Sequence, residues 1–177
     1  MVAAAVVLEP GTRIDGVGDS KRLLPADREE LDAVIRARAI AVAVGLADAP
    51  TVDRVNVLEA TRRAMRQALA ALGVEPELVL IDFVVLAGLA CPQRNLVRGD
   101  QRSATVAAAS IIAKVARDRM MVEADREYPQ YGFGQHKGYP TPDHRAALLA
   151  HGPCPLHRMS FTGVAQPDLF DYAQGEE

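Results

Sequence analysis

The feature that most constrains this chain is an unbroken run of small and aliphatic residues in its second half. The run extends from Ser103 to Ile112 and leads directly into Lys114, Arg117 and Asp118. Ala, Ile and Val in such a run favour a helix packed closely against another element, because small side chains allow close approach. The sequence therefore predicts a buried central helix, and the rest of the fold has to cover it.

One polar stripe runs along that helix. Ser110, Lys114 and Arg117 are spaced at i, i+4 and i+7, so they share a face. Asp100 lies just before the first turn, after Gly99. Two interpretations of Asp100 stay open on spacing alone: it caps the helix, or its carboxylate holds a hard metal ion beside the basic stripe.

The length of 177 residues predicts one domain with its own hydrophobic core. No apolar run is long enough for a transmembrane helix, so we expect no membrane association. Cys91 and Cys154 each neighbour a proline and show no metal-binding spacing. They predict reduced thiols and a cytoplasmic location, and we expect a monomer.

Charge is unevenly distributed along the chain. Between Arg94 and Arg119 there are six basic residues against two acidic ones, whereas the tail from Asp168 to Glu177 carries four acidic residues and no basic one. The formal net charge of −3 argues against a protein that coats nucleic acid indiscriminately. The basic segment is compatible with phosphate contacts and equally with an ordinary solvated face.

Apolar strands alternate with amphipathic helices, which predicts an α/β fold without internal repeats or linkers. We expect a helix that begins at Pro25 and another that begins with a capping box at Asn56. The apolar face of the second helix is predicted to contain Leu58, Thr61, Met65, Ala68, Leu69 and Leu72. Strands are predicted over 2–8, 40–46 and 77–81, and a short helix over 141–149.

Asp82 directly follows the strand predicted over 77–81. Open α/β sheets bind their ligands at the carboxyl ends of strands, so a carboxylate at this position is a candidate ligand. Asp at the end of a strand is also a common turn former. The residue pattern leaves both interpretations open.

Six segments occur in an order that resembles one known family. They are D-S-K-R-L, L-I-D, V-R-G-D, A-A-A-S-I-I-A-K-V-A-R-D-R, Y-P-Q-Y-G-F-G-Q-H-K-G-Y-P-T and H-R-M-S-F. Together they resemble bacterial ribonuclease HII over roughly residues 1–164. The expected organisation is a ribonuclease HII-like domain over 1–165 and an acidic tail over 166–177.

The resemblance implies a ribonuclease H-like fold, with a mixed β-sheet flanked by helices. It also implies an endonuclease that cleaves the RNA strand of RNA/DNA hybrids and nicks DNA 5′ of embedded ribonucleotides, with Mg²⁺ or Mn²⁺ as cofactor. Among the family's four active-site carboxylates, two match Asp82 and Asp100. We interpret Asp118 as a salt-bridge residue at a helix end rather than as a ligand.

Two departures from the family pattern affect these expectations. The family's other two carboxylates form an Asp-Glu pair in an Asp-Glu-Ala-Gly-Arg-Gly segment on the first strand, whereas M-V-A-A-A-V-V-L resembles the second strand. We therefore expect either a start upstream of Met1 or an impaired remnant that at most binds hybrid nucleic acid. Phe83 stands where the family usually has Gly and is expected to narrow the site.

The resemblance also implies contacts with nucleic acid. Tyr139 resembles the tyrosine that stacks on the sugar at the RNA–DNA junction. Lys21, Arg98 and Lys114 are candidates for phosphate contacts, with ordinary surface charge as the alternative. A sliding clamp is a further candidate partner, through Gln166–Phe170 in the tail. The four histidines lack zinc spacing and are expected to be structural or exposed: His136, His144, His151 and His157.

Overall fold

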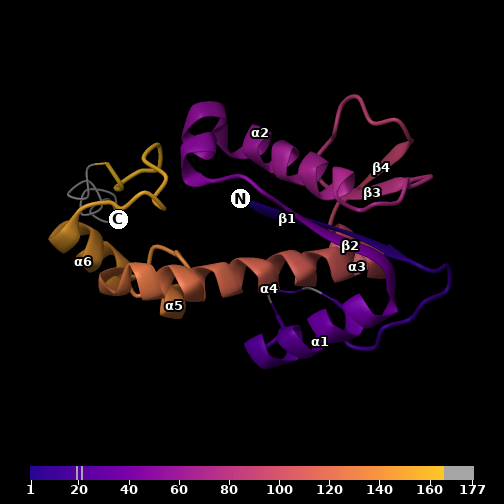
Figure 1. Ribbon diagram of the computed structural model, residues 1–177, viewed down its shortest axis with the longest axis horizontal. Coiled ribbons are helices and arrows are strands. Elements are labelled where there is room, and N and C mark those ends of the chain that lie inside the picture. Colours follow the sequence, from indigo (N-terminus) through magenta and orange to yellow (C-terminus); the bar gives the residue numbers. More distant parts are fainter. Residues whose placement is uncertain (19, 21, 166–177) are drawn as a thin grey trace, which may run out of the picture. The chain divides into compact units, whose positions relative to one another are not determined.

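The computed structural model describes residues 1–18, 20 and 22–165 (Figure 1). Its contacts divide the chain into two compact units. Unit 1 comprises Met1–Ala47 and Leu58–Ala116, and unit 2 comprises Asp48–Val57 and Arg117–Glu177. Helix α4 (Ala104–Glu127) contributes residues to both units.

The first sheet of unit 1 is an antiparallel pair. Strand β1 (Val2–Leu8) pairs with β2 (Ala39–Leu46), and Val6 lies opposite Val42. Helix α1 (Pro25–Arg38) connects the two strands and has its proline in the first turn, where a fixed φ and a missing N–H are tolerated. The strands predicted over 2–8 and 40–46 and the helix start at Pro25 are confirmed.

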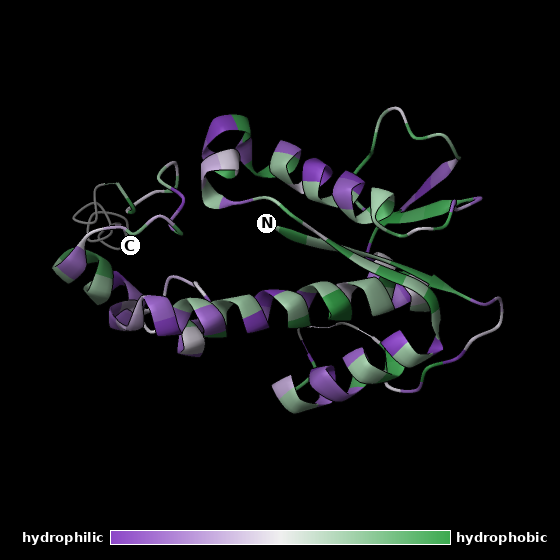
Figure 2. Cartoon of the chain, in the orientation of Figure 1, coloured by the Kyte–Doolittle hydropathy of each residue, from purple (hydrophilic) through white to green (hydrophobic). Residues whose placement is uncertain are grey.

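The second sheet of unit 1 is a parallel pair. Strand β3 (Val79–Asp82) pairs with β4 (Gln93–Leu96). Strand β4 was not predicted, because its residues Q-R-N-L are mostly polar. Figure 2 shows the difference in hydropathy between β4 and the apolar β3. The α/β class is confirmed. Among the described residues, antiparallel and parallel pairing both occur, in two separate two-stranded sheets.

Helix α4 supplies the centre of the unit 1 core, as its small and aliphatic residues predict. Its residues pack in one cluster with Val6 of β1, Ile14 of the following loop and Ile35 of α1. Burial of each large aliphatic side chain contributes roughly 1.5–3 kcal/mol. The α4 residues in this cluster are Ala108, Ile111, Ile112 and Val115.

Helix α2 (Ala49–Ala70) agrees with its prediction in part: a helix starts at the Asn56 kink, as predicted, but another helix precedes it. It begins at Ala49, and the backbone at Asn56, with φ 70°, interrupts it so that two helices meet at a kink. Of the predicted face, Ala68 and Leu72 are buried, and Met65 and Leu69 pack against the β3 cluster. Leu58 is 46% exposed, and Ala60 and Ala64, which were not predicted, are fully buried. The reason is a close approach to β2: a Cβ on Gly45 would lie 1.9 Å from the carbonyl oxygen of Ala64. Only small side chains fit between these two elements.

Unit 2 contains short helices around an aromatic core. After the end of α4 come η1 (Pro129–Tyr131), α5 (Phe133–His136) and α6 (Pro142–His151). The helix predicted over 141–149 is confirmed, and Thr141 caps it by accepting from the N–H of His144. The core of the unit is formed by Tyr131, Phe133, Leu148 and Cys154.

Two composition-based expectations can be compared with the described residues. Cys91 and Cys154 are both free thiols. None of the helices in the described ranges combines the length and apolar character that a membrane span requires.

Phe83 follows β3 in a left-handed backbone conformation, with φ 61°. Its N–H donates to the carbonyl of Leu96 at 3.1 Å and so continues the β3–β4 ladder by one residue. The side chain is 78% exposed. The backbone therefore carries the strain of a non-glycine residue in this region, while the ring gains little from burial.

Gly45→Ala is expected to lower the free energy of unfolding by about 3 kcal/mol, because the added methyl collides with backbone atoms rather than with a flexible side chain. Gly18→Ala is the matched control, since a Cβ at Gly18 meets no atom within 4 Å. Urea unfolding of both variants provides the comparison. Equal stabilities would show that β2 and α2 are not this close.

Phe83→Gly is expected to raise the free energy of unfolding by about 0.5–1 kcal/mol, as relief of left-handed strain outweighs the extra freedom of the unfolded chain. Phe83→Ala keeps the Cβ and should give no gain. Thermal unfolding of the two variants measures the difference. If Phe83→Ala gained the same stability, the cause would be the loss of the ring rather than the relief of backbone strain.

Candidate active site

Asp82 and Asp100 lie on two elements that are joined by one hydrogen bond. Asp82 is the last residue of β3, and its Oδ1 accepts from the backbone N–H of Gly99 at 2.9 Å. Gly99 begins helix α3 (Gly99–Arg102), and Asp100 is the next residue. The structure therefore brings the two predicted carboxylate positions together in unit 1.

Glycine at position 99 permits this approach. A Cβ there would lie 3.0 Å from Cγ1 of Val106, 3.3 Å from Cβ of Leu96 and 3.4 Å from Cβ of Asp82. Contacts below 3.4 Å require a neighbour to move, so a larger residue would push α3 away from β3. In the V-R-G-D segment, Gly99 thus allows the close approach to β3, and Asp100 supplies a carboxylate.

The capping interpretation of Asp100 can be compared with the helix ends. The long helix α4 starts at Ala104, and Oγ of Ser103 accepts from the N–H of Val106 at 3.4 Å. Ser103 therefore occupies the capping position of α4, whereas Asp100 lies inside the first turn of α3. This arrangement leaves the carboxylate of Asp100 available for the other interpretation, that of a metal ligand.

The donor set at this position fits a hard divalent cation. Mg²⁺ is bound in proteins through one or two carboxylates together with waters and substrate phosphates. Asp82 and Asp100 supply two carboxylates, and the Gly99 N–H orients the first. Within the described ranges, no group of three or more His, Cys, Asp or Glu side chains is arranged to hold a metal ion.

Of the three basic residues predicted to contact phosphate, the structure describes Arg98 and Lys114. Arg98 immediately precedes α3 and is exposed. Lys114 is half-buried on α4, one turn after Ser110, whose Oγ lies 2.8 Å from Oγ of Ser20. That hydrogen bond places Ser20, within the D-S-K-R segment, against the polar stripe of α4. Lys21 lies outside the described residues.

Asp118 is not at a helix end, so that part of its prediction is wrong. It lies inside α4, which continues to Glu127. Its Oδ1 is 3.9 Å from Nη1 of Arg117, so it does take part in an ion pair. The apolar run ends at Ile112, but the helix continues because Met121 and Ala124, further along it, pack against the core of unit 2.

Tyr139 belongs to unit 2 and presents its ring to solvent, with 53% of its surface exposed. The guanidinium of Arg117 lies 4.9 Å from the ring centroid, within range of a cation–π contact. Arg117 also donates to the carbonyl of Lys137 at 2.6 Å. An exposed ring that lies against a half-buried guanidinium is compatible with stacking on a ligand.

Three of the four histidines lie together in unit 2, which their spacing did not predict. His144 and His157 are buried, His136 stacks on His144, and His151 is exposed. Burial lowers the pKa of His144, and it lowers the pKa of His157 to about 4. Both rings are therefore neutral at pH 7, and the prediction of structural or exposed histidines is confirmed.

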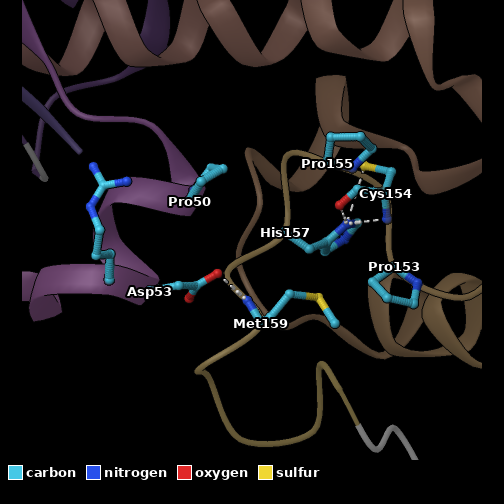
Figure 3. Close-up of a pocket in the computed structure, with 8 residues that line it drawn as sticks. Pro50, Asp53, Pro153, Cys154, Pro155, His157 and Met159 are labelled. Carbon is cyan, nitrogen blue, oxygen red and sulfur yellow. Dashed lines mark hydrogen bonds between the residues drawn. The ribbon is translucent and has the colours of Figure 1, made fainter.

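The H-R-M-S-F segment is anchored by Asp53 of α2. The carboxylate accepts from the N–H of Met159 at 2.8 Å, and from both the N–H and the Oγ of Ser160. The Oγ bond is the main reason that the pKa of Asp53 is lowered. Figure 3 shows Asp53, Met159 and His157 around a pocket of about 720 Å³ in unit 2. None of the predicted site residues lines it.

Comparisons with known proteins agree with this architecture. The family model for Ribonuclease HII matches residues 1–164. A Ribonuclease HII from Geotalea daltonii is 50% identical over 166 residues, which cover 94% of this chain and 77% of the relative.

Two solved structures are similar in fold. The crystal structure of ribonuclease H2 from Pyrococcus horikoshii OT3 gives a TM-score of 0.74 at 23% identity, and the match covers 99% of this chain and 100% of that one. A structure of the PCNA:RNase HII complex from Archaeoglobus fulgidus gives a TM-score of 0.71 at 24% identity, covering 95% and 89%. With its family match and its bacterial relative, the chain belongs to the ribonuclease HII family and is a ribonuclease H-type endoribonuclease.

Proposed function

We propose that this protein cleaves the RNA strand of RNA/DNA hybrids and nicks DNA 5′ of embedded ribonucleotides, by metal-assisted hydrolysis of the phosphodiester. The observation that carries the proposal is the hydrogen bond between Asp82 and Gly99, which holds one carboxylate beside the residue that precedes the other. Membership of the ribonuclease HII family supports the same chemistry.

Asp82 and Asp100 would hold the divalent cation, Mg²⁺ or Mn²⁺. A bound cation of this kind activates the attacking water and stabilises the leaving oxygen. The protein's own contribution is to fix the carboxylates: Asp82 through the Gly99 N–H, and Asp100 through the first turn of α3. Rigid placement of ligands matters because small displacements reduce the rate strongly.

Tyr139 would recognise the substrate by stacking on the sugar at the RNA–DNA junction, where RNA and DNA differ by the 2′-OH. Its exposed ring, backed by Arg117, is compatible with this role. Arg98 and Lys114, together with Lys21, would contact phosphates and contribute a salt-dependent share of the affinity.

The direct test uses three duplexes of equal length: a continuous RNA/DNA hybrid, DNA with one ribonucleotide, and all-DNA. The protein and the variants below are tested with the family's Asp-Glu segment present ahead of Met1, and we then expect Mn²⁺- or Mg²⁺-dependent cleavage of the first two and none of the third. With only Asp82 and Asp100 of the four carboxylates, we expect no more than trace cleavage. Hybrid binding without cleavage would contradict the proposal and would support the alternative of a binding-only protein.

A clamp partner remains a prediction. The Archaeoglobus fulgidus relative was solved in complex with PCNA, which supports a sliding clamp as a candidate partner of this chain. The segment that would bind it, Gln166–Phe170, lies outside the described residues.

Asp82→Asn and Asp100→Asn are each expected to lower the cleavage rate by at least about a thousandfold, because the amide removes the negative charge that a hard cation requires. Asp118→Asn is the matched control and should retain most activity, since an ion pair of this type contributes under about 1 kcal/mol. Single-turnover rates on the hybrid provide the measurement. Loss of activity in the Asp118 variant alone would contradict the assignment of Asp100.

Tyr139→Ala is expected to slow cleavage at a single ribonucleotide by roughly tenfold to a hundredfold, as stacking on a nucleotide is worth about 1–3 kcal/mol. Cleavage of a continuous hybrid requires less discrimination between sugars and should fall less. The two rates are measured side by side at saturating metal. Equal losses on both substrates would mean that Tyr139 only shapes its loop.

A further inference from the structure

Two buried histidines of unit 2 contact each other through their ring nitrogens. Nε2 of His144 lies 3.0 Å from Nε2 of His157, and the two residues are 6% and 7% exposed. A hydrogen bond between two imidazoles requires one nitrogen to carry a proton and the other to lack one. The neighbours of the pair decide which nitrogen carries it.

Those neighbours impose a single direction. The backbone N–H of Cys154 can only donate, and it points to Nδ1 of His157 at 3.0 Å (Figure 3). The Cys154 carbonyl oxygen and thiol sulfur also lie 3.3 Å and 3.2 Å from that nitrogen. The shorter N–H contact fits a neutral His157 that carries its proton on Nε2 and donates to His144. His144 in turn carries its proton on Nδ1, which lies 2.9 Å from the carbonyl oxygen of Tyr139. The reverse direction would let Nδ1 of His157 donate to the Cys154 carbonyl at 3.3 Å, but it would set a lone pair of His144 against the Tyr139 carbonyl at 2.9 Å. The Tyr139 carbonyl can only accept, so it sets the direction.

The endpoint of this chain is the backbone that carries the exposed ring. The carbonyl of Tyr139 also accepts from the N–H of Thr141 at 2.8 Å, and the N–H of Tyr139 donates to the carbonyl of His136 at 2.9 Å. The preceding turn is unusual, because Lys137 and Gly138 have φ of 52° and 76°. A turn with two successive left-handed residues needs fixed contacts to stay in place.

The surroundings keep the pair neutral. Burial lowers the pKa of both histidines, and each is lowered further by a neighbouring imidazole: His136 for His144, and His144 for His157. Because folded His157 has a pKa of about 4, against 6.5 for the unfolded chain, its contribution to stability is complete above pH 6.5 and is lost as the pH falls toward 4. The groups that face the pair are the His136 ring, the Cys154 thiol, the Tyr131 phenol and the Phe133 ring.

We propose that His157 and His144 form a directed hydrogen-bond relay, from the Cys154 N–H to the Tyr139 carbonyl, that positions Tyr139 for discrimination between sugars. The relay rests on the proposed function for the role of the Tyr139 ring. His144 and His157 act as positioning residues, because neither needs to touch the substrate. The preference for one substrate over the other thus depends on two buried residues, His144 and His157.

Two substitutions of His144 test its two hydrogen bonds separately. In His144→Asn the amide nitrogen takes the place of Nδ1 and can still donate to the Tyr139 carbonyl. In His144→Gln the amide oxygen takes the place of Nε2, so the His157 contact remains and the donor to Tyr139 is lost. His151→Gln, at an exposed position of the same helix, is the matched control.

The readout is the ratio of cleavage rates on a single-ribonucleotide duplex and on a continuous hybrid. We expect the ratio to fall about tenfold in His144→Gln, because the Tyr139 carbonyl loses one of its two donors, and to stay within about threefold of the parent in His144→Asn. Equal falls in both variants would reduce His144 to a packing residue and overturn the proposal.

A second measurement does not depend on activity. Nitrogen-15 NMR of the histidine side chains should find the proton on Nδ1 of His144 and on Nε2 of His157, and amide exchange at Tyr139 should accelerate in His144→Gln but not in His144→Asn. The opposite tautomers, or identical exchange in both variants, would overturn the relay. The predicted tautomers together with an unchanged rate ratio in Tyr139→Ala would instead contradict the proposed function of Tyr139.

Discussion

The burial of one face of α4 is the constraint on which unit 1 depends. Ala108, Ile111 and Ile112 reach the core together with residues of β1 and α1, so three elements far apart in sequence share one cluster. The same helix begins directly after α3, which carries Asp100. Placement of α4 therefore also sets the position of Asp100, one of the two proposed ligands, before any metal or substrate is considered.

Two glycines allow elements of unit 1 to approach each other closely. At Gly45 the backbone of β2 approaches α2, and at Gly99 the start of α3 approaches the end of β3. The second approach lets the Gly99 N–H reach the Asp82 carboxylate at 2.9 Å. A helix N–H that donates to a carboxylate stabilises the negative charge and orients the group. The candidate site is thus a consequence of backbone proximity rather than of a cluster of many acidic residues.

The two units use polar contacts in different ways. In unit 1 the serine pair Ser20–Ser110 and the Asp82–Gly99 bond attach loops and short elements to the apolar core. In unit 2, polar rings form part of the core: His157 lies edge-on to Tyr131 at 5.0 Å and tilted to Phe133 at 5.4 Å. Buried imidazoles are stable there because each ring nitrogen of the pair has a partner.

The elements that the sequence predicted well are those whose pattern is local. The apolar strands β1 and β2 and the small-residue helix α4 follow from runs of residues that can only be buried. Strand β4 was missed because Q-R-N-L has no apolar pattern, and its pairing with β3 depends on a partner elsewhere in the chain.

Features that depend on distant contacts were not predictable from local pattern. The buried face of α2 was predicted only in part: Ala60 and Ala64 were missed, because the close approach of Gly45 requires small residues there. Asp82 and Asp100 came from the family resemblance, whereas the hydrogen bond that joins their elements and the histidine relay required coordinates. Spacing in sequence does not reveal which nitrogen of a histidine faces which carbonyl.

The proposed chemistry requires Asp82 and Asp100 together to hold a divalent cation. Anomalous diffraction from crystals grown with Mn²⁺ tests it most directly, because the signal locates the metal without reference to activity. We predict a manganese peak bonded to the carboxylates of both Asp82 and Asp100, which disappears in crystals of Asp100→Asn. A peak at Asp118, or a peak between Asp82 and Asp100 that survives the Asp100→Asn substitution, would contradict it.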